Sequence, residues 1–179
     1  MISEQARRGV NLIFTRAAAI NLAVAPTDRV EVVPLDGHGL TVPPEKNIMV
    51  LTIASYVFRL LTIFHVDTDS ATEAYFTRSG AAGEFRDCFG EIGNRCCGAM
   101  NRELGRYFQH MGMSTPSMLE SKCLPYLADL DPTYLAHHRI RINDALVLHA
   151  TLCLCAYAPI DFHVDHEVAP ETTVELELF

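Results

Sequence analysis

The chain has 179 residues, 49% of them hydrophobic, and a formal net charge of −8. This length and composition predict one globular domain over residues 1–179 and exclude an intrinsically disordered chain. The acidic balance disfavours nucleic acid and anionic membrane as partners, and it suits a partner with a basic rim. No apolar run reaches the roughly 20 residues of a bilayer span, so no membrane association is expected.

The first predicted element is an amphipathic helix over residues 3–23, because apolar residues recur there at helical spacing and Pro26 follows its end. A signal peptide is the alternative interpretation of this segment. Asn11 and Arg16 interrupt its apolar stretch, so the helix is preferred.

The next elements alternate between strand and helix patterns. Residues 29–35 predict a short strand closed by the turn DGHG. Residues 47–55 and 56–67 are rich in β-branched and aromatic side chains, which is typical of two paired strands. Residues 70–78 predict a short helix.

The clearest helical pattern covers residues 84–111, and Gly112 and Pro116 provide stop signals after it. Its predicted apolar face consists of Phe85, Phe89, Ile92, Cys96, Ala99, Leu104, Tyr107 and Met111.

After this helix, residues 117–137 show no clear pattern, and the cluster DLDPTYLAHH, residues 129–138, is expected to form an irregular connection. Residues 139–158 predict one or two strands, and 172–179 alternate as a last strand. The order of elements therefore predicts an α+β fold, in which long helices cover an antiparallel sheet.

Four residues of the long helix, Asp87, Glu91, Asn94 and Gly98, fall on one stripe opposite its apolar face. Glu91 and Asn94 are three residues apart, so their side chains are neighbours. A carboxamide can hold a water molecule in place, an acid can bind a cation of a partner, and glycine leaves the adjacent surface bare. The stripe therefore predicts a small catalytic surface that acts on another protein.

The spacing resembles a family signature. In the CheC/CheX/FliY chemotaxis phosphatases the pattern is Asp or Ser, three residues, Glu, two residues, Asn, twenty-one residues, Pro. This chain has Asp87, Glu91 and Asn94 at those positions, then 21 residues to Pro116, and Gly98 matches the glycine usual after the Asn. One copy of the motif is found, which resembles the CheX-like branch with a single active site.

The resemblance implies a CheC/CheX-like fold and a phosphatase that acts on the aspartyl phosphate of a CheY-like receiver domain. It implies that Asn94 positions the attacking water and that Glu91 contacts the receiver's lysine, while Asp87, Gly98 and Pro116 are motif positions with less defined roles. The receiver supplies Mg²⁺, so the chain is expected to need no cofactor of its own. A homodimer is also implied.

Other interpretations remain open for the stripe. It can be an ordinary solvated helix face, and Asp87 can simply stabilise the first helical turn through the helix dipole. The main functional rival is a non-catalytic module of the same fold, which binds a receiver or a flagellar switch component.

The six cysteines contain no C-x-x-C pair and are best explained as free thiols in a reducing cytoplasm. A thiol sensor at Cys96/Cys97 or Cys153/Cys155 is a third functional hypothesis. Cys96 and Arg102 have the C-x5-R spacing of cysteine phosphatases, but within a helix no loop of N–H groups can surround a phosphate.

The segment DFHVDHE, residues 161–167, is interpreted as a solvated strand end. A metal site there is the alternative, because Asp161, His163 and Asp165 would share one side of a strand. No metal site is assigned.

Overall fold

The computed structural model describes residues 1–35, 45–78 and 84–165. Within these residues seven strands form one antiparallel sheet in the spatial order β1-β6-β7-β3-β2-β4, and β5 pairs with β2 along the same edge as β4. The strands are β1 (Val30–Leu35), β2 (Asn47–Ala54), β3 (Phe58–Val66), β4 (Gly112–Met113), β5 (Ser117–Glu120), β6 (Tyr134–Ile142) and β7 (Leu146–Ala156).

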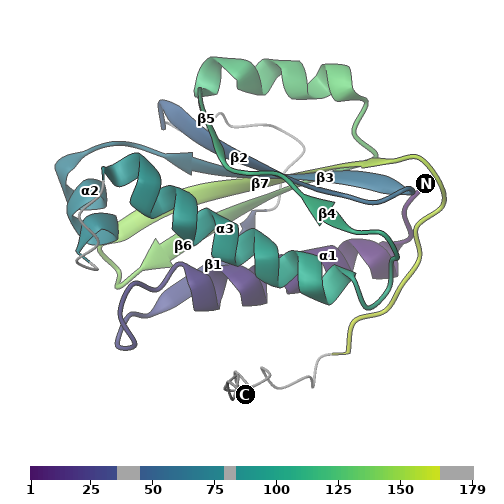
Figure 1. The fold of residues 1–179 in the computed structure, drawn as a ribbon, viewed down its shortest axis with the longest axis horizontal. Helices are drawn as coiled ribbons and strands as arrows, with labels where there is room; N and C mark the ends of the chain where they lie inside the picture. Colours follow the sequence, from purple (N-terminus) through teal and green to yellow (C-terminus); the bar gives the residue numbers. More distant parts are fainter. Residues whose placement is uncertain (36–44, 79–83, 166–179) are drawn as a thin grey trace, which may run out of the picture.

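Helices lie on both faces of this sheet. Helices α1 (Glu4–Asn21) and α3 (Phe85–Leu104) pack side by side on one face, with α2 (Ser70–Thr77) at the end of the molecule. A 3-10 helix, η1 (Ser121–Leu130), covers part of the other face (Figure 1). The predicted α+β fold, an antiparallel sheet covered by helices, is confirmed.

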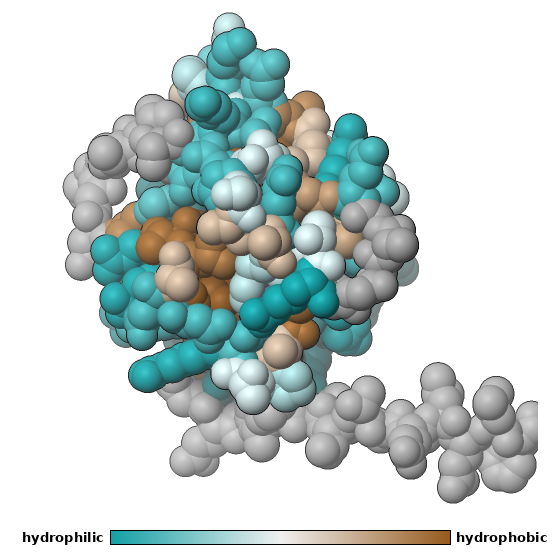
Figure 2. Space-filling view, turned by 90° about the vertical axis from the view of Figure 1, so that its left-hand side faces the viewer, coloured by the Kyte–Doolittle hydropathy of each residue, from teal (hydrophilic) through white to brown (hydrophobic). Residues whose placement is uncertain are grey.

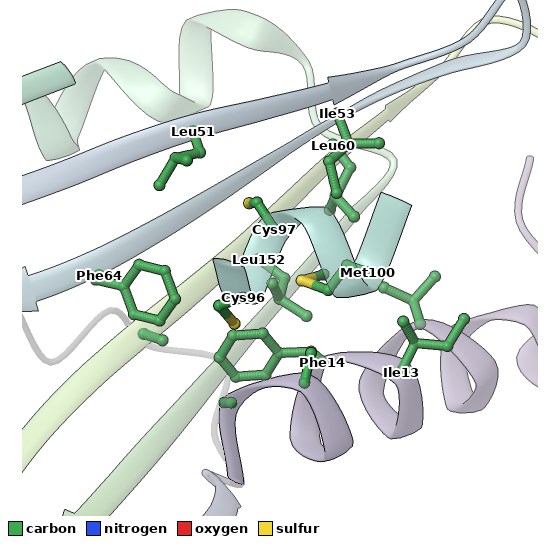
Figure 3. Packing of buried hydrophobic residues seen from close by; sticks show 14 of the residues in the cluster. Ile13, Phe14, Leu51, Ile53, Leu60, Phe64, Cys96, Cys97, Met100 and Leu152 are labelled. Atoms are coloured by element: carbon green, nitrogen blue, oxygen red, sulfur yellow. The ribbon is translucent and has the colours of Figure 1, made fainter. Parts of the chain in front are cut away.

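The period-two alternation of the strands divides the core between the two faces. On β3, Phe58, Leu60 and Phe64 belong to the large cluster shared with α1 and α3, whereas Ile63 belongs to a smaller cluster beneath η1. Helix α3 contributes its inward face to the large cluster (Figure 3). The three residues Cys96, Cys97 and Met100 are fully buried there among Phe14 of α1, Phe64 and Leu152.

The long helix is shorter than predicted, because it ends at Leu104 with Gly105 as its C-cap. The chain then turns into β4, which pairs with Ile53 and Ala54 of β2. Tyr107 and Met111, which were predicted on the apolar face of the helix, lie beyond its end, and Tyr107 is exposed. Phe108, which lies between them in sequence, packs its ring 5.0 Å from that of Phe58. Hydrophobic spacing alone therefore predicted a helix longer than the observed one.

The expected irregular connection over 129–138 is wrong for residues 134–138, which belong to β6. The segment 117–137 as a whole is largely regular. It contains β5, all of η1 and the start of β6. Leu124 and Leu127 of η1 are buried against Ile63 and Cys153 on the outer face of the sheet. Burial of these two leucines orders a segment whose local pattern is weak.

The remaining predicted elements agree with the structure where it describes them. Helices α1 and α2 and strands β1, β2 and β3 lie at the predicted places, and the segment 139–158 provides β6 and β7. The predicted turn at 36–39 and the predicted strand 172–179 lie outside the described residues.

The surface at the α2 end is largely hydrophilic around a compact hydrophobic patch (Figure 2). Within the described residues, no helix is both long enough and apolar enough to cross a bilayer.

Candidate active site on helix α3

Helix α3 approaches the sheet closely at Gly93. A Cβ atom at Gly93 would overlap the Cε atom of Met49 and would lie 3.2 Å from Cδ1 of Leu51, both on β2. The absence of a side chain therefore lets the helix lie directly on β2. This close packing determines which way the opposite face of α3 points.

That outer face carries the predicted stripe. Asp87, Glu91, Asn94 and Gly98 lie within an arc of about 60° around the helix. Asp87 and Glu91 are exposed, and Asn94 and Gly98 are half-buried. Figure 3 shows the other side of the same helix, from which Cys96 and Met100 point into the core.

Glu91 and Asn94 make no side-chain hydrogen bond or ion pair with any other described residue. Arg95, one turn after Glu91, is likewise not within ion-pair distance of it. Both polar groups lie near the middle of α3, where the backbone N–H groups are engaged within the helix. The site therefore offers side chains, and not a helix terminus, to a visiting molecule.

Pro116 joins this surface from a different part of the chain. It lies between β4 and β5, which both pair with β2, and its Cγ would be 3.7 Å from a Cβ at Gly90. Gly90 precedes Asn94 by one turn, so the proline borders the stripe on one side. The tertiary structure thus brings the five motif positions together on one surface.

Gly98 leaves an open area beyond Asn94. Within the described residues, the nearest atom to a Cβ at this position would be Nη1 of Arg102, at 3.7 Å. Apart from Arg102, no side chain of the described residues lies within 4 Å of a Cβ at Gly98.

Asp87 lies in the first turn of α3, where a negative charge interacts favourably with the helix dipole. A stabilising role is thus available to it without any ligand.

Cys96 and Cys97 of α3 do not provide a nucleophile. Burial raises the pKa of the Cys97 thiol to about 11 and raises the pKa of Cys96 well above its usual range. Cys96 points into the core, whereas Arg102 is exposed, so the C-x5-R spacing does not form a phosphate loop. Burial also raises the pKa of Cys153 to about 12, so these thiols lack the lowered pKa of reactive cysteines.

The acid and histidine segment near residue 161 has partners of its own. Ser3 donates a hydrogen bond to Asp161 at 2.5 Å, and His163 lies 3.2 Å from Asp165. Among residues 1–35, 45–78 and 84–165, no three His, Cys, Asp or Glu side chains are grouped to hold a metal ion.

Two residues important to this surface lay outside the sequence motif. Gly93 holds the helix close to the sheet, and Arg102 extends over Gly98. The i, i+4 spacing of Gly98 and Arg102 was a signal for the second contact. Nothing in the local sequence distinguished Gly93 from the other glycines of the helix.

Comparisons with known proteins identify the fold. No family model and no curated protein matches the sequence. The solved structure of the CheX chemotaxis protein from Desulfovibrio desulfuricans gives a TM-score of 0.58 at 12% identity, over 82% of this chain and 99% of that one. A chain of the CheX–CheY–BeF3–Mg²⁺ complex from Borrelia burgdorferi gives 0.59 at 12% identity, over 81% and 97%.

The middle domain of FliM from Vibrio alginolyticus is also similar, with a TM-score of 0.52 at 12% identity over 83% of this chain and 91% of that one. The class defined by these likenesses is the α+β fold shared by chemotaxis and flagellar proteins. Within that class the chain has the CheC/CheX-type fold, so the resemblance found in the motif is confirmed at the level of the fold.

Proposed function

We propose that the chain is a phosphatase that removes the aspartyl phosphate of a CheY-like receiver domain through the site on α3. One observation carries this proposal: Glu91 and Asn94 project side by side from a rigid helix, without partners among the described residues, next to the bare surface of Gly98. Polar groups held in place by packing but left unpaired are suited to a visiting substrate.

The two side chains have complementary tasks in this proposal. The Asn94 carboxamide accepts from and donates to a water molecule, and so holds it in line with the phosphorus atom. The Glu91 carboxylate pairs with the lysine of the receiver. Because an acyl phosphate already hydrolyses unaided, positioning the water needs to lower the barrier by only a few kcal/mol.

The partner brings the rest of the chemistry. The described residues group no metal ligands, and the proposed Mg²⁺ is that of the receiver. The solved complex of similar fold contains CheX, CheY, BeF3 and Mg²⁺ together, which supports a receiver as the partner.

The same proposal covers the whole chain. Residues 1–179 act as one domain in the cytoplasm, and two copies form a homodimer with one site in each protomer. The single motif supports this CheX-like arrangement.

A second candidate is a non-catalytic module that binds a receiver or a flagellar switch component. The likeness of fold to the FliM middle domain favours it. Both candidates use the same exposed surface, so only a measurement of turnover separates them.

The decisive experiment follows loss of label from ³²P-phosphorylated CheY-type receivers of the source organism in the presence of Mg²⁺. The wild type should accelerate the loss, and Asn94→Ala should reduce this acceleration by roughly 100-fold, since misplacing a reacting group has effects of that order. Gln5→Ala removes an exposed carboxamide from α1 and should leave the rate unchanged.

Equal decay with wild type and Asn94→Ala would rule out the catalytic role. Binding of the wild type to a beryllofluoride-loaded receiver, without accelerated decay, would then support the non-catalytic module.

A further inference from the structure

Arg102 is placed beside the candidate site although it is not part of the motif. It is exposed, and no hydrogen bond or ion pair to another described residue holds its guanidinium. Side chains on a helix lean toward its N-terminus. This lean carries the guanidinium back over the preceding turn, where Nη1 would lie 3.7 Å from a Cβ at Gly98.

The position of this cation relative to Glu91 and Asn94 follows from helix geometry. Glu91, Gly98 and Arg102 lie within about 40° of one another around the axis. The Cα atoms of Asn94 and Arg102 are about 12 Å apart along the axis, and Gly98 lies halfway between them. The guanidinium therefore ends about one turn from Asn94, across the bare surface.

We propose that Arg102 binds the phosphoryl group of the partner and stabilises its charge during hydrolysis. This inference rests on the proposed function, and it adds a phosphate-binding group that the pair Glu91 and Asn94 lacks. If Glu91 pairs with the receiver lysine, it draws a positive charge away from the phosphoryl oxygens. A free guanidinium at the same surface replaces that charge.

The chemistry of arginine suits the task. Its planar fork of N–H donors matches two phosphoryl oxygens and stays charged throughout the reaction. In the step itself, the water oxygen forms a bond to phosphorus, and the bond from phosphorus to the aspartyl oxygen breaks. The electron pair stays on the aspartate carboxylate, and both water protons leave with the inorganic phosphate. Arg102 neither gains nor loses a proton.

Arg86 provides a matched control on the same helix. It lies eight residues before Asn94, as Arg102 lies eight residues after it, and it is also exposed. Because side chains lean toward the N-terminus, Arg86 extends away from the site whereas Arg102 extends toward it. The two arginines therefore share chemistry and distance along the helix but differ in direction.

The test compares Arg102→Gln, Arg102→Lys and Arg86→Gln with the wild type on ³²P-phosphorylated receivers. Arg102→Gln should lower kcat by about 100-fold, the lower end of the range found when one charge-stabilising donor is removed, and should raise KM by no more than about 10-fold. Arg102→Lys should recover part of the rate, and Arg86→Gln should keep it. Equal melting temperatures would show that all four proteins are folded alike.

Binding gives a second readout that does not depend on turnover. The wild type should bind a beryllofluoride-loaded receiver more tightly than the unloaded receiver. In Arg102→Gln the ratio of these two affinities should fall about 10-fold. Asn94→Ala should retain it.

An active wild type together with an equally active Arg102→Gln would overturn this inference alone, as would a change confined to KM. A wild type that accelerates the decay of no receiver would overturn the proposed function and this inference with it.

Discussion

The hydroxyl of Tyr75 donates a hydrogen bond of 2.8 Å to Oδ2 of Asp28, joining the last helical turns of α2 to the loop between α1 and β1. Asp28 also accepts from the backbone N–H of Ala25, from Asn143 in the β6–β7 turn and from the guanidinium of Arg78. The Arg78 guanidinium holds the pKa of this carboxyl well below its usual range. One buried carboxylate thus connects three segments that are distant in sequence.

We predict that Asp28→Ala lowers the free energy of unfolding by about 2–3 kcal/mol, because it leaves several donors without their acceptor. Urea denaturation followed by circular dichroism measures this change. Asp144→Asn, at an exposed position of positive φ in the same β6–β7 turn that asparagine also favours, should change stability by less than about 0.5 kcal/mol. A loss of similar size in both variants would show that Asp28 is not the connecting group.

Acid should destabilise the protein because two histidines are buried. Burial lowers the pKa of His65 to about 4, and it lowers the pKa of His138, whose ring lies 4.7 Å from the ring of Phe14, to about 4. The unfolded chain binds protons on these groups near pH 6.5. The stability they contribute is therefore present above pH 6.5 and is lost as the pH falls toward 4.

The expected loss between pH 7.5 and pH 5 is about 2 kcal/mol for each histidine. His138→Leu should remove about half of this pH dependence. The free energy of unfolding of this variant at pH 7.5 should not fall by more than about 1 kcal/mol, because neither ring nitrogen of His138 has a hydrogen-bond partner among the described residues. Urea denaturation at the two pH values measures both effects, with exposed His163→Gln as the control. An unchanged pH dependence in His138→Leu would contradict the prediction.

Substitutions at Gly98 should affect stability and activity differently. Gly98→Ala should raise the free energy of unfolding by about 0.5–1 kcal/mol, because its Cβ meets only Arg102 at ordinary contact distance and alanine favours the helix. Gly98→Leu should leave the fold intact but raise KM for a phosphorylated receiver, because a large side chain keeps the partner away. Denaturation and the ³²P assay measure the two effects. Full activity of Gly98→Leu would exclude close approach of a partner at this position.

Gly93 should behave in the opposite way. Gly93→Val should lower the free energy of unfolding by about 1–3 kcal/mol, because its Cβ would overlap the end of Met49 and displace the helix from β2. In the Met49→Ala background, Gly93→Val should lower the free energy of unfolding by less than it does in the wild type. Thermal and urea denaturation of this double-mutant cycle measure the coupling, and additive effects would argue against the contact.

The sequence by itself determined the parts of the protein that depend on local periodicity. Spacing of 3.6 residues predicted α1 and the outward stripe on α3, and spacing of two predicted a strand where β7 lies. The motif from Asp87 to Pro116 was enough to point to the CheC/CheX-type fold. These features were predictable because a regular element repeats its geometry along the chain.

Only the tertiary structure decided the rest. It ended α3 at Leu104, ordered η1 against the face of the sheet opposite α1 and α3, and placed Pro116 beside Gly90, twenty-six residues away in sequence. It also showed that Gly93 brings α3 onto β2 and that Arg102 extends over Gly98. Each of these features depends on contacts between segments that are distant in sequence, and sequence spacing does not give their distance in space. The physical cause is packing between elements, which no pattern within a single element predicts.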